Sequence, residues 1–238
     1  MTQSPSNSAG VAQPRLLQLL AHSGAPLADD PLPCCGERLG RLFGLSDTLI
    51  LDSAIAFRAR QPGMDQGSAI ERVIQELANT RRALIGKISS YGSEVEPTDS
   101  VDFEPYLNAW LALQRRVIAA SRQLRDKARK VMKDHNQNLA RLAELDSAFD
   151  HAMAGYTSQC FSHIPKVLEQ RFQALFPALL QAQQTPSEPS RETGSAPGDW
   201  LNRYCEEAQN LLFAELDVRL EPVLGLLEAC HNEVTISS

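Results

Sequence analysis

The chain has 238 residues, of which 43% are apolar, 22% charged and only 6% aromatic, and its formal net charge is -6. This composition excludes collagen-like repeats, extensive disorder and a membrane channel, and the acidic balance argues against binding nucleic acid through overall charge. The length fits one large domain or two small ones, because single cores stop growing at about 250 to 300 residues. No reaction follows from these values.

Cysteine usage and the lack of a targeting segment predict a cytoplasmic protein. The five cysteines form one adjacent pair, Cys34 and Cys35, and three isolated positions, which is no disulfide framework and favours a reducing compartment. A polar, Ser- and Pro-rich N-terminus precedes LLQLLA, an apolar run too short for a signal core or a transmembrane helix. No later segment reaches about 20 apolar residues, so we expect any membrane association to be indirect, through a partner.

The N-terminal third is predicted to contain a tail and several short helices. Residues 1–13 are expected to be a disordered tail, and residues 14–182 a helical domain that begins at a proline, whose fixed φ suits a helix start. A second short helix over residues 36–44 is expected to end at its last glycine. Ser46 or Asp47 is expected to cap a third helix.

The fourth predicted helix, over residues 68–92, has the clearest start signal. Ser68 and Glu71 have the three-residue spacing of a capping box. Apolar residues then recur with the helical period: Ile70, Val73, Ile74, Leu77, Leu84, Ile85 and Ile88.

The longest helical signal runs from Pro105 to Gly155. A continuous helix of this length would span about 75 Å at about 1.5 Å per residue, so we expect a break between residues 134 and 137. Pro165 is expected to end or kink the helix that follows, and Pro177 to interrupt the next amphipathic segment. The first half carries apolar residues at steps of three and four, as a seam between packed helices requires: Trp110, Leu113, Val117, Ala120, Leu124 and Val131.

The last part of the chain is predicted to be a linker and one helix. Residues 183–198 are rich in Ser, Pro, Thr and Gly without apolar periodicity, which indicates a flexible linker. A C-terminal helix follows over residues 199–231, which is expected to pack back on the bundle or on a partner, and Pro222 is expected to kink or divide it. Because no alternating β-branched runs occur, the predicted fold is all-α: an elongated helical bundle with long coiled-coil-like central helices and a flexible linker before the C-terminal helix.

Two segments carry opposite charges. Residues 115–133 contain eight basic residues and one acidic residue, a net charge of +7, whereas residues 199–233 contain two basic and eight acidic residues, a net charge of -6. We interpret these segments as complementary rims that orient two paired helices. A solvated face without a partner is the second interpretation. The third is a basic surface for nucleic acid or acidic lipid headgroups, formed by Arg115, Arg116, Arg122, Arg125, Arg129 and Lys130.

Nucleic acid is not the partner that we expect. The basic segment has no interleaved aromatic residue on which a base would stack, and it has no Gly-rich turn that would bind phosphate.

No motif for catalysis, metal binding or cofactor binding occurs in the sequence. There is no phosphate-binding Gly loop, nucleophile elbow or HExxH motif. Cys160 and His163 are three residues apart, but a structural zinc site normally needs four ligands. The carboxylates fall on polar helical faces, where solvation explains them. We therefore expect no enzymatic activity, no metal and no cofactor.

Several stretches of the chain together indicate a family. They are DFEPYLNAWLALQRRV, WLNRY and LLFAELDVRLEPVLGLLEA, with PRLLQLL, GERLGRLFGLSD, RLAELDSAFD and the region from VLEQRF to LFP. In this order they resemble an uncharacterised proteobacterial family catalogued as domain of unknown function 3348. The resemblance implies no assigned activity and no known site residues. It implies an accessory cytoplasmic role, because members are often encoded beside membrane proteins similar to the proton-channel and peptidoglycan-binding halves of flagellar-motor-like complexes.

The function that we expect is that of a scaffold or adaptor without catalytic activity. Its partner would be another protein or a second copy of the chain, bound through helices. The alternative function is binding of nucleic acid or an acidic surface through the basic segment. The predicted association surface consists of apolar positions on the two longest seams: Trp110, Val117, Leu124, Val131, Leu211, Leu212 and Leu220.

Overall fold

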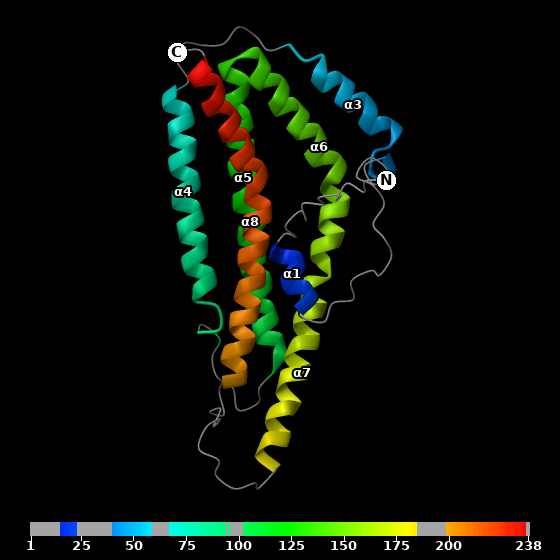
Figure 1. Cartoon of the computed structure of the whole chain (residues 1–238), viewed down its shortest axis with the longest axis vertical. Helices are drawn as coiled ribbons and strands as arrows, with labels where there is room; N and C mark the ends of the chain where they lie inside the picture. The colour runs from blue at the N-terminus through cyan, green and yellow to red at the C-terminus, as the bar shows by residue number, and fades with distance from the viewer. Residues whose placement is uncertain are drawn as a thin grey trace, which may run out of the picture.

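The structure, a computed structural model, describes residues 15–22, 40–58, 67–93, 95, 102–184 and 199–236. All regular secondary structure in these ranges is helical, which confirms the all-α prediction. The helices pack into an elongated bundle in which α4, α5 and α8 run side by side (Figure 1). The labelled helices are α1 (Arg15–His22), α3 (Leu45–Ile55), α4 (Gly67–Ser89), α5 (Phe103–His135), α6 (Gln137–Ser162), α7 (Ile164–Gln184) and α8 (Asp199–Ile236).

The long central signal is divided into α5 and α6 at Asn136, which confirms the predicted break. Asn136 is extended, with φ -152° and ψ 172°, so the helical hydrogen-bond ladder stops there. Its side-chain oxygen accepts a hydrogen bond from the backbone nitrogen of Leu139 at 2.8 Å and caps the start of α6. Since the chain reverses at this residue, α6 packs back against α5.

Helix α5 lies at the centre of the bundle and has neighbours on several sides. It packs against α4, α6, α7 and α8, and its contacts with α8 and α6 are the most extensive. The indole of Trp110 is fully buried, and its Nε1 donates a hydrogen bond to the carbonyl oxygen of Ala208 on α8 at 3.2 Å. The apolar stripes of α5 and α8 therefore meet inside the monomer and form most of its core.

Aromatic rings close one end of the bundle where α5, α7 and α8 meet. The Phe172 ring of α7 lies 5.1 Å from Tyr204 and 5.4 Å from Trp200 of α8, centroid to centroid, with nearly perpendicular planes. Tyr106 of α5 is in similar contact with Tyr204 at 6.2 Å. Edge-to-face pairs of this kind favour a fixed arrangement of the three helices at this end.

Helix α3 lies at the edge of the bundle and packs on α6. It begins at Leu45 with Gly44 as its N-cap, so the predicted cap at Ser46 or Asp47 is wrong. The reason is that the Asp47 carboxylate reaches back from the first turn and accepts a hydrogen bond from the Gly44 nitrogen at 2.8 Å. Just before α3, the Phe43 ring contacts the Phe149 ring of α6 at a centroid distance of 5.2 Å.

Prolines have different effects in different helices. The chain leaves α6 at His163 and starts α7 at Ile164, so a helix boundary falls beside Pro165 as predicted. Helix α7 continues through Pro177, and α8 is one helix that contains Pro222, so neither proline divides its helix. In α8 the buried residues on both sides of Pro222 contribute enough packing to offset the lost hydrogen bond, which costs about 3 kcal/mol.

Some predicted segments lie partly or wholly outside the described residues. The predicted tail, Cys34 and Cys35, and all but the first two residues of the predicted linker are among them. Of the predicted second helix, residues 40–44 are described, and within them 40–42 are helical whereas 43 and 44 are not. The C-terminal helix extends to Ile236, five residues beyond its predicted end.

Candidate functional site

The residues predicted to form an association surface lie mostly in the core of the monomer. Val131 is half-buried and packs against this core. The other six predicted residues contact helices of the same chain and so stabilise the bundle. An apolar surface for a partner must therefore consist of other residues. These six are at most 2% exposed: Trp110, Val117, Leu124, Leu211, Leu212 and Leu220.

The six residues of the predicted basic surface fall into two groups. Arg115, Arg116, Arg122 and Lys130 are exposed. Arg125 and Arg129 instead point at α6 and bind its carboxylates. Asp146 accepts a hydrogen bond from Arg125 Nη2 at 2.6 Å and another from Arg129 Nε at 2.6 Å.

Asp150 completes this ion-pair cluster between α5 and α6. It accepts hydrogen bonds from Arg125 Nη1 at 2.7 Å and from Arg129 Nη2 at 2.9 Å. The side chains of Arg125, Arg129 and Asp146 are 17%, 11% and 13% exposed, whereas that of Asp150 is 43% exposed, so the cluster is shielded from water around Asp146 and open to it at Asp150. Two of the six cations are therefore neutralised inside the protein and are not available to an external anion.

The predicted charge pairing between the basic and acidic helices is wrong in its details. Helices α5 and α8 do pack together, but through their apolar seams. The lysines of the basic segment bind other helices: Lys127 binds Glu76 of α4, and Lys133 binds Glu144 of α6 at 2.6 Å. The basic segment thus pairs with α4 and α6, because apolar stripes occupy the sides on which α5 and α8 face each other.

Two carboxylates of α8 form ion pairs with neighbouring helices. Glu207 forms a two-point ion pair with Arg171 of α7, with distances of 2.5 and 2.8 Å. Hydrogen bonds from Arg171 lower the pKa of the Glu207 carboxyl below its usual value. Asp217 binds Arg81 of α4 at 3.2 Å. Glu207 therefore links α8 to α7 by a largely buried pair, and Asp217 links α8 to α4 by a half-exposed one.

Glu215 is a fully buried carboxylate that sequence reasoning missed. Gln114 Nε2 donates to both of its oxygens, at 3.3 and 3.0 Å, and Arg219 Nε donates to Oε1 at 2.7 Å. The Arg219 guanidinium also lies 4.1 Å from the centroid of the Phe161 ring. Burial raises the pKa of the Glu215 carboxyl, opposed by Arg219 and Gln114. The available sequence signal was the position of Glu215 inside the apolar run LLFAELDV.

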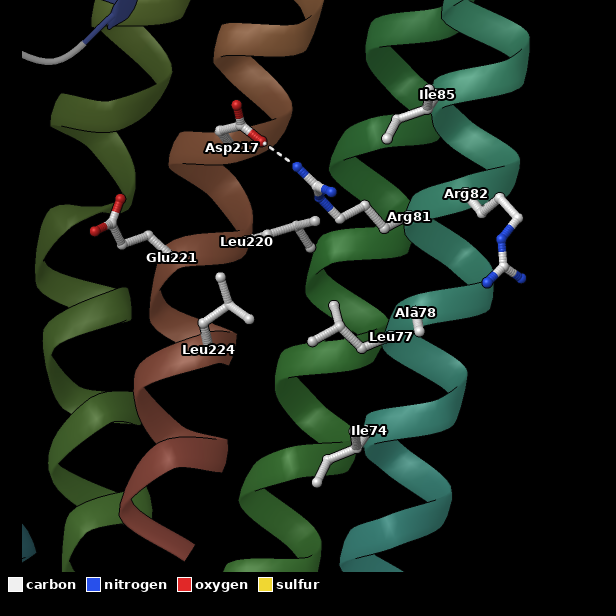
Figure 2. Close-up of a pocket in the computed structure, with 10 residues that line it drawn as sticks. All are labelled: Ile74, Leu77, Ala78, Arg81, Arg82, Ile85, Asp217, Leu220, Glu221 and Leu224. Carbon is white, nitrogen blue, oxygen red and sulfur yellow. Dashed lines mark hydrogen bonds and ion pairs between the residues drawn. The ribbon is translucent and has the colours of Figure 1, made fainter. Parts of the chain in front are cut away.

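A groove of about 900 Å³ lies between α4 and α8 (Figure 2). Leu77 and Leu220 are buried at its base, Ile74 and Ile85 are half-buried, and Leu224 is 53% exposed. The groove therefore offers apolar side chains from two helices at the surface of the bundle.

Charged side chains surround the apolar part of this groove and divide by helix. Arg81 and Arg82 belong to the α4 edge, and Asp217 and Glu221 belong to the α8 edge. The ion pair between Arg81 and Asp217 crosses the groove (Figure 2). Arg82 donates a hydrogen bond to Asn79 at 3.1 Å, and Glu221 is exposed on the outer side of α8.

A second apolar surface lies on α3. Leu45 is 81% exposed, Leu49 66% and Ile55 62%, because the apolar residues of α3 are spread around its circumference and only one side of the helix packs on α6. The hollow beside it, of about 550 Å³, is lined by α3 and α6. Exposed large apolar side chains in the described residues therefore cluster on α3, and one, Leu224, lies at the α4/α8 groove; the others are Leu17, Phe149, Tyr156 and Val218.

The described residues include three cysteines, of which Cys160 is exposed, Cys205 half-buried and Cys230 buried. The described residues contain no group of three or more His, Cys, Asp or Glu side chains placed to hold a metal ion. Burial raises the pKa of the Cys205 and Cys230 thiols to about 11, so both are protonated at neutral pH. Across the same ranges, no helix combines the length and the apolarity needed to cross a bilayer.

Comparison with known proteins places the chain in a family. A family model described as "Protein of unknown function (DUF3348)" matches residues 1–232 and so confirms the resemblance found in the sequence. Neither a comparison with curated proteins nor one with solved structures found a match. Because the model covers nearly the whole sequence, the chain belongs to the DUF3348 family.

Proposed function

We propose that this protein is a non-catalytic helical scaffold that binds a helical surface of another polypeptide in the α4/α8 groove. The observation that carries the proposal is the groove itself, with apolar side chains at its base and a half-exposed leucine, Leu224, on its edge. Long apolar grooves between helices bind amphipathic helices through side chains spaced three and four residues apart. The residues of α4 and α8 that line this groove have that spacing.

The ion pairs within the chain support a structural role for the charged groups that form them. The cations of α5 in the cluster with α6, and Glu207 and Glu215 of α8, are held by partners within the chain, which leaves them in positions that stabilise the bundle. The setting that we propose is the cytoplasm, beside a motor-like inner-membrane complex. This setting rests on what the family resemblance implies.

Replacement of Leu224 by Glu tests the function. The side chain is 53% exposed, so the charge should be tolerated by the monomer but should disfavour an apolar partner surface. Leu17→Glu on α1 is the matched control, since Leu17 is 46% exposed and lies outside the groove. We expect both variants to keep the helical circular dichroism of the wild type.

The measurement is quantitative affinity purification from the native host. Partners that bind in the groove should be depleted with Leu224→Glu and retained with Leu17→Glu. Equal recovery of every co-purified protein with the two variants would argue against the groove as the docking site.

A further inference from the structure

We propose that the groove binds a second copy of this chain, and that the two copies are related by a two-fold axis parallel to the groove. This inference rests on the proposed function and names the partner at the same site. The charges that line the groove divide by helix. Its α4 edge is basic, with Arg81 and Arg82, and its α8 edge is acidic, with Asp217 and Glu221.

A two-fold interface requires a surface that is complementary to itself, so that each contact occurs twice. Rotation about an axis along the groove places the α4 edge of one copy over the α8 edge of the other. Basic residues then face acidic residues on both sides of the axis. Rotation about an axis across the groove would instead place α4 on α4 and α8 on α8, so that like charges meet. The charge pattern therefore selects the axis along the groove.

The positions of the side chains fit this axis. In Figure 2, Arg82 and Glu221 project from opposite outer sides of the groove at a similar level, with Arg81 and Asp217 between them. The rotation brings Arg82 of each copy to Glu221 of the other. It also brings Arg81 of each copy to Asp217 of the other, so that two ion pairs meet near the axis.

The apolar side chains of the groove supply the contact between these charged edges. Leu224 is 53% exposed in the monomer, and Ile74 and Ile85 are half-buried, so all three gain burial when a second copy covers them. Helices α4 and α8 run in opposite directions (Figure 1). The dimer therefore places four helices at its interface, each antiparallel to the helix that it faces, as in a four-helix bundle.

A charge swap tests this arrangement. Arg82→Glu places a second carboxylate against Glu221 at both symmetric contacts, and Glu221→Arg places two guanidinium groups together. We expect each variant to raise the dimer dissociation constant at least about tenfold. The double variant, Arg82→Glu with Glu221→Arg in one chain, restores opposite charges and should restore the dimer.

Mixing the two single variants gives a second readout. A heterodimer of Arg82→Glu with Glu221→Arg has one contact between the two introduced charges and one between the two native ones, so opposite charges meet at both. It should therefore form although neither variant dimerises well alone. Sedimentation velocity measures all of these species, and circular dichroism verifies that each variant is folded.

A wild-type protein that stays monomeric at its highest soluble concentration overturns the proposal. Failure of the double variant and of the mixture to dimerise overturns it as well.

Crosslinking separates this inference from the broader function. A photoreactive amino acid replaces Leu224 in the full chain expressed in its host, and the adducts are identified by mass spectrometry, with the same replacement at Leu17 as control. An adduct with another copy of the chain, specific to position 224, supports the dimer. An adduct with a different protein supports the scaffold function but overturns the second copy as the occupant. Absence of any specific adduct counts against both.

Discussion

At the level of single residues, Glu215 shows how burial and pairing compete. The carboxylate is 0% exposed and is held by Gln114 and Arg219. Burial still raises its pKa in the folded protein, because the lost hydration outweighs the contacts that favour the charged form. The folded state therefore binds a proton at Glu215 more tightly than the unfolded state does. Its contribution to stability is present at low pH and is lost as the pH rises through the folded pKa.

Glu215→Gln removes this pH dependence. We expect the free energy of unfolding of the variant to increase relative to that of the wild type as the pH rises from about 4 to about 7. The amide keeps an oxygen that can accept from Gln114 and Arg219, so the fold should persist. Urea titrations at a series of pH values measure the difference. A difference that does not change with pH would contradict the assignment of a raised pKa.

Glu207→Gln is the matched control, because its pKa is shifted in the opposite direction. Hydrogen bonds from Arg171 lower the pKa of the Glu207 carboxyl, so its contribution is present above the unfolded pKa and is lost as the pH falls through the folded pKa. The wild type should therefore be more stable than this variant at neutral pH, by about 0.5 to 1 kcal/mol, and the difference should vanish in acid.

Gly92 is the residue whose backbone excludes a side chain. Its φ is 91°, and an added Cβ would lie 2.5 Å from Cys205 Sγ. The turn that contains it is fixed to α8, since Gln209 Nε2 donates to the carbonyl oxygens of Ser89 and Tyr91. Strain and overlap therefore cannot be relieved by moving the turn away.

We expect Gly92→Ala to lower the free energy of unfolding by about 1 to 3 kcal/mol. Adding Cys205→Ala should recover part of the loss, because it removes the sulfur but leaves the positive φ. Chemical denaturation of the two variants and of Cys205→Ala alone measures the coupling. An unchanged stability of Gly92→Ala would mean that the turn adopts another conformation.

At the level of helices, the sequence was sufficient where the signals are local. The periodic segments predicted α4, α5 and α6, because apolar periodicity depends on near neighbours, and the length of the signal from Pro105 to Gly155 indicated the break between α5 and α6. The effect of Pro222 could not be predicted in the same way. Proline locally disfavours a helix, but the packing of residues on both sides of Pro222 against other helices outweighs this local preference.

The candidate site required the tertiary arrangement for a similar reason. An apolar stripe on a helix does not indicate whether the same chain or another one covers it. Trp110 and Leu212 lie on stripes that other helices of the monomer cover, whereas Leu224, on the same helix as Leu212, is left at an open groove. The ion-pair partners of Arg125 and Arg129 could not be predicted either, because the turn at Asn136 brings the carboxylate of Asp146 on α6 next to them.

The cluster between α5 and α6 should make these helices interdependent. Asp146 accepts from both Arg125 and Arg129, and all three side chains are less than one fifth exposed. We expect Asp146→Ala to lower the free energy of unfolding by about 3 kcal/mol, because two arginines lose their shared buried partner. Glu76→Gln is the control, since Glu76 and Lys127 are both 40% exposed and the pair should contribute less than about 1 kcal/mol. Equal losses in urea titrations would argue against a cooperative cluster.

At the level of the whole molecule, the distribution of charge bears on the alternative function. The net charge of the chain is -6, and Asp146 and Asp150 neutralise Arg125 and Arg129 within the bundle. Four residues of the predicted basic surface remain exposed: Arg115, Arg116, Arg122 and Lys130. Since binding to a DNA duplex loses affinity with salt by a logarithmic slope of about 0.9 per phosphate contact, four contacts would give a slope of at most about 4.

We expect the wild type to show no retention of duplex DNA or of anionic vesicles at physiological ionic strength. The long-range field of an acidic protein opposes approach of a polyanion, and four cations give too few contacts to offset it. Fluorescence anisotropy and vesicle co-sedimentation over a range of salt concentrations measure the retention. A variant with all four exposed cations changed to Gln is the control. Binding by the wild type with a slope of about 4 that this variant abolishes would show that the basic surface is a true binding site.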